Sequence, residues 1–221
     1  MCAHGVECRT CCSAFLSLTP SAFEPFRAQG VGARGAVPLA RSLALNAHLQ
    51  ALDLGDNGLK AAGIGEIVSA LTGGGAPALR LLSLRQNQAG EDGADSICAL
   101  LQSAHPLTSL DLAGNALGNK GVARLAEGLA ANRTVSALCL EHNEIDSEGA
   151  ERLAPALASN AALTSLSLEW NQIGPPGGKA LAEALRESHA HSSLGSVSAP
   201  LESRATRSAA GSSPRAPARA R

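Results

Sequence analysis

Three short stretches of the sequence contain residue types that could do chemistry. The first holds His4, Cys8, Cys11 and Cys12, which include one C-x-x-C pair. A structural zinc site needs four ligands and usually takes them from two such pairs. Reversible S-acylation and redox sensitivity are alternatives for these thiols. Because one pair stands alone in a weakly patterned segment, we interpret the cysteines as inert thiols and predict no metal site.

The other two stretches lack the spacing that their chemistry requires. GPPGGK at 174–179 has the spacing G-x-x-x-G-K, one residue short of a phosphate-binding loop, and Ala180 stands where Ser or Thr would bind magnesium. Cys139 and His142 are three residues apart, but a strand would turn them to different positions, and no acid has a role beside them. We therefore expect no cofactor and no catalytic residue, and predict that the chain is not an enzyme.

The elements that would position these residues are set by an internal repeat. The pattern L-x-x-L-x-L-x-x-N-x-(L/I/A)-x-x-x-G-x-x-x-(L/I)-x-x-x-L occurs five times between Leu49 and Leu185. Gaps of 30, 28, 28 and 28 residues separate its asparagines, which are Asn57, Asn87, Asn115, Asn143 and Asn171. A fixed period of this size predicts a solenoid, in which each unit buries its apolar face by stacking on its neighbours.

Each unit encodes a strand followed by a helix. Counted from the asparagine, leucines at −8, −5 and −3 indicate a short strand whose −6, −4 and −2 positions face outward. Apolar residues at +7, +10, +11 and +14 have the spacing of one helical stripe. Because strands stack about 4.8 Å apart while helices are about 10 Å across, the array must curve. The sequence thus predicts an α/β solenoid, a horseshoe segment with a concave parallel sheet and convex helices.

The ends of the helices also have recurring residue types. Residues that tolerate a helix N-cap stand at +3: Gly90, Gly118, Asp146 and Gly174, the last followed by Pro175. At +17 stand types that accept the left-handed conformation ending a helix: Gly74, Asn132 and Asn160. The repeat asparagine itself is expected at the bend after the strand, where its amide can bond backbone groups that no strand serves.

Asparagine-marked units of 28 residues resemble the ribonuclease-inhibitor class of leucine-rich repeats, over residues 49–187. That class includes the repeat regions of NOD-like receptors and the activators of the Ran GTPase. The resemblance implies the solenoid fold and a protein-binding role. It also leaves open two alternatives, a regulator of a small GTPase and a sensor or regulatory fragment of NOD-like receptor type.

The two ends of the chain depart from the repeat. Residues 1–20 are expected to be poorly ordered, and 21–48 to form a degenerate capping repeat with Gln29 in the asparagine position and Phe26 as its one good strand match. Residues 188–221 are rich in Ser, Ala, Arg and Pro, and we expect them to be disordered. Without a C-terminal cap, the apolar edge around Leu166, Leu181 and Leu185 is expected to be open to a partner or to self-association.

Composition narrows the class of partner. Residues 49–187 contain 16 acidic and 9 basic residues, a net −7 that argues against nucleic acid on the repeats. No stretch approaches about 18 continuous apolar residues, so we predict no membrane span. The chain has no evident signal peptide, and the repeat cysteines show no pairing. We therefore expect a cytoplasmic protein.

The outward strand positions are the best candidates for a binding surface. In the first three units most of these positions hold small or sparse side chains, whereas the last two place acids beside the single tryptophan. Tryptophan with a charged rim is the composition of an interface anchor. We predict that the concave face binds another protein, basic in character, through Trp170, Glu169, His142, Glu141, Asp111, Arg85 and Asp53.

Overall fold

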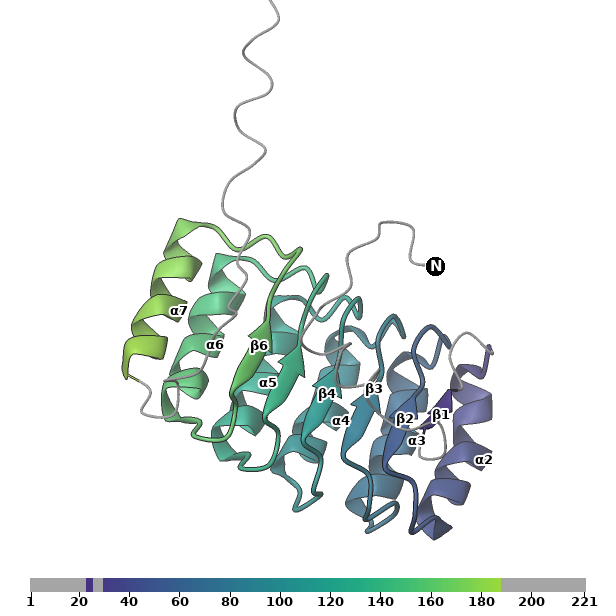
Figure 1. Ribbon diagram of the computed structural model, residues 1–221. Helices are drawn as coiled ribbons and strands as arrows, with labels where there is room; N and C mark the ends of the chain where they lie inside the picture. Colours follow the sequence, from purple (N-terminus) through teal and green to yellow (C-terminus); the bar gives the residue numbers. More distant parts are fainter. Residues whose placement is uncertain (1–22, 26–29, 188–221) are drawn as a thin grey trace, which may run out of the picture.

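The computed structural model describes residues 23–25 and 30–187, which form one curved array of strand–helix units (Figure 1). Within this part of the chain, three-residue strands alternate with helices of 13 or 14 residues. The strands are β1 Phe23–Pro25, β2 Ala51–Asp53, β3 Leu81–Ser83, β4 Ser109–Asp111, β5 Ala137–Cys139 and β6 Ser165–Ser167. The helices are α2 Gly32–Leu45, α3 Lys60–Thr72, α4 Gly90–Gln102, α5 Gly118–Ala131, α6 Ser147–Ser159 and α7 Pro175–Glu187.

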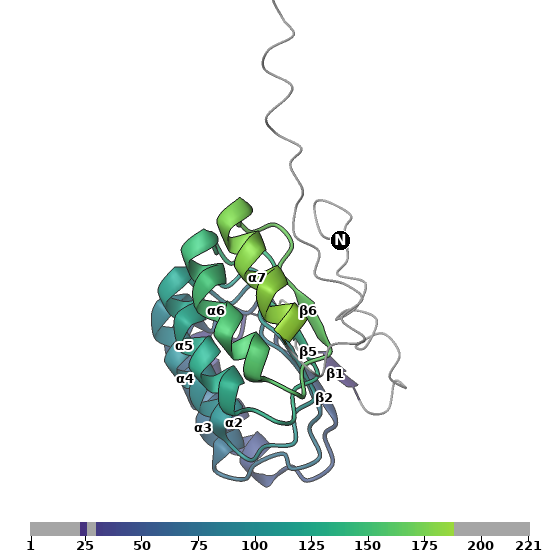
Figure 2. The ribbon, with the colours of Figure 1, turned by 90° about the vertical axis from the view of Figure 1, so that its left-hand side faces the viewer.

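The strands form one parallel sheet in sequence order, β1 to β6. Equivalent positions pair across it, as Leu81 pairs with Ser109 and Ser109 with Ala137. In the described part of the chain, all the helices lie on one face of this sheet and none lies on the other (Figure 2). We call the helix-free face the inner wall. The predicted solenoid with its concave parallel sheet and convex helices is confirmed.

Strand β1 belongs to the segment in which the sequence showed little strand pattern. Phe23 pairs with Ala51, so β1 occupies the same −6 to −4 positions, counted from Gln29, as every later strand. Helix α2 follows it in phase. Pairing with the edge of β2 supplies the order that the apolar pattern of β1 does not.

The predicted apolar positions form a single continuous core. The strand leucines Leu52, Leu82 and Leu110 are all fully buried. On the helix side, Val122 and Leu125 are equally inaccessible. Burial of a leucine side chain is worth roughly 1.5–3 kcal/mol, so the shared core is the main source of stability in this array.

The repeat asparagines form a hydrogen-bonded ladder above the strands. The Asn115 Oδ1 accepts from the N–H groups of Asn87 and Ala89 in the preceding unit, at 3.1 and 3.3 Å. Its Nδ2 donates to the carbonyls of Leu84 and Leu112, at 3.0 and 2.9 Å. Each buried amide therefore serves backbone groups of two consecutive units, as the sequence predicted for the bend.

A second ladder lies at the other end of the helices, where the prediction for +17 was partly wrong. Gly74 does adopt the left-handed conformation, with φ of 92°. Asn132 and Asn160 instead have extended backbones, with φ of −70° and −83°. Their side chains explain why: the Asn160 Oδ1 accepts from two N–H groups ahead, while its Nδ2 donates 2.6 Å to the carbonyl of Leu129 in the preceding unit.

The helix starts also differ from the prediction. Asp146 is a true cap, because its Oδ1 accepts from the N–H groups of Glu148 and Gly149 at 2.7 and 3.4 Å. Gly90 and Gly118 serve differently, since each adopts a left-handed backbone with φ near 60°. Helix α7 begins at Pro175, as expected.

The glycine at +6 of each unit allows neighbouring helices to approach closely. A Cβ added to Gly177 would lie 2.8 Å from the Cα of Ser147 and 2.9 Å from the Cβ of Ala150. A Cβ on Gly149 would meet the Asn119 side chain at 2.5 Å. This close approach accounts for Gly177 within the 174–179 stretch.

At the C-terminal end the prediction of an open edge was wrong for two of its three residues. Leu166 and Leu181 are buried, at 1% and 2% exposed, because α7 closes the last unit over β6 and both side chains join the common core. Leu185 alone is partly exposed. The predictions for residues 1–20 and 188–221, including the His4 and cysteine cluster, lie outside the described residues.

Candidate functional site

The residue before each ladder asparagine forms a row that we call the rim: Asp56, Gln86, Gly114, His142 and Trp170. Each has a left-handed backbone, with φ of 58°, 54°, 68°, 52° and 59° respectively. This conformation costs a residue other than glycine roughly 1–2 kcal/mol, and the ladder bonds that follow it hold it in place. Because all five share one backbone geometry, side chains of adjacent units leave the rim in the same direction.

His142 and Trp170 form a parallel stack on the rim. Their ring centroids lie 5.5 Å apart and the ring planes differ by 4°. Trp170 nevertheless keeps 57% of its surface exposed, so one indole face is covered and much of the remainder meets solvent. The stack fixes the orientation of an exposed aromatic ring.

The imidazole in this stack is held in its neutral form. Burial lowers the pKa of His142 below its usual value, and the positive charge of Arg85 lowers that pKa further. At pH 7 the stack is therefore a pair of neutral rings, and protonation requires more acid than for a free histidine.

Glu141 and Glu169 lie on the inner wall beneath the rim. The Ser167 hydroxyl donates to Glu141 Oε1 at 2.6 Å, and Glu141 is 7% exposed. Glu169 is half-buried. The carboxylate at 141 is thus held by the neighbouring strand, while that at 169 is the more accessible of the two.

Two predicted residues have a structural role in the bend. Asp53 Oδ1 accepts from the Gly55 N–H at 2.8 Å, and Asp111 Oδ1 accepts from the Ala113 N–H at 3.0 Å. Asp111 is 4% exposed. These short side chains form turns of the kind aspartate favours, so they contribute negative charge to the wall more than direct contacts.

Arg85 lies along the wall towards the first units. A Cβ on Gly55 would be 2.7 Å from the Arg85 Cγ, so the glycine makes room for the arginine stem. Arg85 is half-buried. Among the residues predicted to bind a partner, Trp170 and His142 are in direct contact, and Glu169 precedes Trp170 in the sequence.

Sequence reasoning missed two features of this site. Ser167, which holds Glu141, is an outward strand residue but has no signal that distinguishes it from Ser165. The left-handed rim could have been suspected from Gly114, the one glycine in the row.

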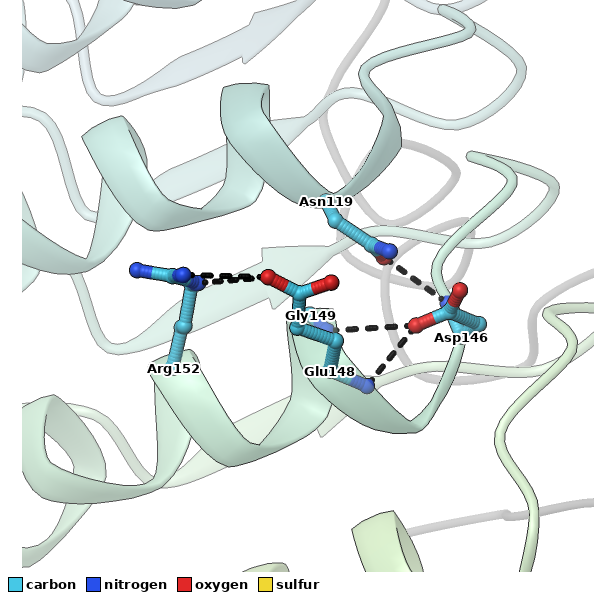
Figure 3. Close-up of polar contacts among 5 residues, drawn as sticks. All are labelled: Asn119, Asp146, Glu148, Gly149 and Arg152. Atoms are coloured by element: carbon cyan, nitrogen blue, oxygen red, sulfur yellow. Dashed lines mark hydrogen bonds and ion pairs between the residues drawn. The ribbon is translucent and has the colours of Figure 1, made fainter.

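The convex side has a charged hollow of about 710 Å³ between helices α4, α5 and α6. Figure 3 shows its edge, where the Asn119 Oδ1 accepts from the Asp146 N–H at 3.1 Å and Arg152 pairs with Glu148 at 3.0 Å. Asn119 and the capped N–H groups lower the pKa of Asp146. The charged side chains that pair in this hollow, across α4 and α5 or within α6, are more than half exposed, and such pairs contribute little.

Among the described residues, no group of three or more His, Cys, Asp or Glu side chains could hold a metal ion. Cys98 and Cys139 are both buried, and burial raises the pKa of Cys98. No helix in the described part of the chain is both long and apolar enough to cross a bilayer.

Comparison with known proteins agrees with this geometry. The leucine-rich-repeat family model matches residues 45–68, 103–126, 131–154 and 159–182. No curated protein matches the sequence. The tropomodulin C-terminal domain of Caenorhabditis elegans superposes with a TM-score of 0.56 at 13% identity, over 70% of this chain and 92% of that one. The leiomodin-1 actin-binding site 2 has a TM-score of 0.44 at 17% identity, over 71% and 73%. Repeat sequence and solenoid fold together identify the chain as a leucine-rich-repeat protein.

Proposed function

We propose that this protein is a non-enzymatic scaffold that binds a partner protein on the inner wall, with Trp170 as the anchor. The observation that supports this most directly is an indole that is 57% exposed yet fixed by its stack on His142 and by a left-handed backbone. An exposed indole adds less to the stability of the fold than a buried one would. An immobilised aromatic ring, however, loses little conformational entropy on binding.

The partner is proposed to be basic where it meets the wall. Glu169 is the half-buried carboxylate beside the anchor, Asp53 is half-buried as well, and Asp111 and Glu141 add negative charge from buried positions. Complementary charge mainly raises the association rate and excludes acidic competitors. The shape of the rigid wall would then select among basic partners.

Class and compartment remain part of this proposal. The 28-residue period and the strand–helix units favour the ribonuclease-inhibitor-like class of leucine-rich repeats. The buried free thiol of Cys98 fits a reducing compartment, so we propose a cytoplasmic location.

Affinity capture with Trp170→Ala tests the proposal. Loss of a buried interface tryptophan typically costs about 2–4 kcal/mol, or roughly 30- to 1000-fold in affinity. Leu45→Ala is the matched control, because Leu45 is the other large exposed apolar side chain among the described residues and lies on α2. Proteins captured by the wild type and the control, and lost from Trp170→Ala, are the expected partners.

A second variant tests the charge. Glu169→Lys reverses the accessible carboxylate and should weaken capture of the same proteins most at low salt. Equal recovery by wild type and Trp170→Ala, with both still folded, would reject the anchor. Recovery that is lost with Trp170→Ala but unchanged by Glu169→Lys would reject only the basic partner.

A further inference from the structure

The two ends of the array present complementary halves of the contact that joins its internal units. Three features recur at every internal junction that the structure describes in full. They are apposed apolar helix stripes, an asparagine ladder above the strands, and backbone groups bonded by the next unit. Each can be followed to the first and last units.

At the C-terminal end, no described residue covers the apolar stripe of α7 that faces away from α6. Ala182 is exposed, whereas the equivalent residues of the four preceding units are at most 7% exposed: Val68, Cys98, Ala126 and Ala154. A Cβ on Gly178 would meet nothing within 4 Å, and Leu185 is partly exposed. The stripe that receives the next helix elsewhere is present here without one.

At the N-terminal end, no described residue covers the side of α2 that faces away from α3. Leu39 is partly exposed, although its equivalents in the next four units are fully buried: Ile67, Ile97, Leu125 and Leu153. Gly35 corresponds to the close-contact glycines, yet among the described residues a Cβ there would meet only Val31, the N-cap of α2. Ser42, two turns beyond Gly35, is exposed.

The second ladder, formed at the helix ends by Asn132 and Asn160, is incomplete at the first and last units. Asn46 Oδ1 accepts from the N–H groups of His48 and Leu49 in the geometry of Asn132 and Asn160. Those two asparagines donate Nδ2 to the carbonyl at +14 of the preceding unit. Within the described residues, the Asn46 Nδ2 has no such acceptor. The carbonyl of Leu185, at +14 of the last unit, has no such donor among them.

The ladder of repeat asparagines ends at two backbone N–H groups that have no acceptor among the described residues. The N–H groups of Asn143 and Ile145 both donate to Asn171 Oδ1, at 2.9 and 3.1 Å. In the last unit, no described residue accepts from the equivalent N–H groups of Asn171 and Ile173. In the first unit the sequence places Gln29, with its own amide oxygen, in the asparagine position.

We propose that a second copy of this chain docks head-to-tail, with its α2 unit on the α7 unit of the first. In the geometry of an internal junction, Gly35 packs on Gly178, Ser42 on Ala182, and the Asn46 amide donates to the Leu185 carbonyl. Pro25 has no N–H to add to this edge, so the junction is weaker than an internal one. Such a contact does not close on itself, so copies extend the inner wall in a line.

Sedimentation equilibrium of the full-length chain tests this proposal. We expect the average mass of the wild type to rise with concentration from about 5 to about 500 µM and to pass that of a dimer. Ala182→Arg blocks the C-terminal half of the contact and Ser42→Arg the N-terminal half. Both replace exposed helical residues, so the fold should tolerate them. Ser69→Arg, at an exposed position of α3, is the matched control and should associate like the wild type.

Mixing the two blocked variants makes the test specific. Each should be monomeric alone, while together they form a dimer that does not lengthen, since one retains each half of the contact. A wild type that stays monomeric throughout overturns the proposal, and so does an Ala182→Arg variant that associates normally. Dimers of Ser42→Arg alone would show a symmetric contact instead. None of these outcomes bears on Trp170→Ala capture, so the proposed function stands or falls separately.

Discussion

Replacing Asn115 with alanine is the most direct test of how the repeat is held together. The side chain is fully buried and makes hydrogen bonds to backbone groups of both its own unit and the preceding one. If the ladder stabilises the array, this change should cost far more than an exposed amide does. The structure allows the cost to be estimated bond by bond.

The carbonyl groups lose little in this variant. Leu84 O still accepts from the Asn87 amide at 2.9 Å, and Leu112 O from the Asn143 amide at 2.9 Å. The N–H groups of Asn87 and Ala89, in contrast, have no acceptor other than Asn115 Oδ1 among the described residues. An orphaned buried donor costs about 1–3 kcal/mol, so two should cost about 2–6 kcal/mol. That is a large share of the 5–15 kcal/mol typical of a whole domain.

Urea unfolding followed by far-ultraviolet circular dichroism and by Trp170 fluorescence provides the measurement. Gln102→Ala, at an exposed helix end, is the control and should stay within about 0.5 kcal/mol of the wild type. A cost below about 1 kcal/mol for Asn115→Ala would refute the reasoning. The two probes must also report one transition, because a solenoid that unfolds in parts has no single free energy.

Three further predictions concern stability and the rim. Burial lowers the pKa of His105 in the fold, although the backbone at Gly75 and Ala76 partly opposes this shift. The unfolded chain then takes up the proton more readily, so stability is full above pH 6.5 and falls as pH drops through and below that value; urea titrations should show a shallower fall for His105→Gln. In thermal melts, Gly177→Ala should destabilise the fold by about 1–3 kcal/mol, because the added methyl group would contact α6. Gly178→Ala should stabilise it by about 0.5–1 kcal/mol in the same melts, because that methyl group would meet nothing within 4 Å. Because Trp170 stacks on His142, its emission should change with a midpoint below pH 6.5, and His142→Gln should remove that step.

The periodic parts of this fold were predictable because the same residue types recur at equivalent positions of five repeats. Five copies of the strand leucines and helix stripes leave one architecture that buries them all, and residues such as Leu110 and Leu125 are buried as expected. Strand β1 was less predictable because its order comes from pairing with β2 instead of its own leucines. Likewise, Asn160 could satisfy a helix end by backbone or by side chain, and its residue type does not decide which.

The candidate site was only partly predictable because it depends on side-chain direction. Spacing assigned both Asp111 and Glu169 to the wall. The short side chain of Asp111, however, accepts a hydrogen bond from the Ala113 N–H in its own turn. A longer glutamate at a neighbouring position is left more accessible. His142 and Trp170 stack with both backbones in the left-handed conformation. Neither histidine nor tryptophan is a residue type that suggests this conformation.

The rim shows how a uniform scaffold acquires one distinctive place. The ladder imposes the same left-handed backbone on every rim residue, so the cost of orienting a side chain there is met by the fold whatever that side chain is. Asp56, Gln86 and Gly114 use this geometry for nothing larger than a polar group. Only at the end of the row does the chain place an indole and support it with a neutral imidazole. Since that support would be unnecessary for a residue meeting water alone, the asymmetry of the rim favours recognition at its C-terminal end.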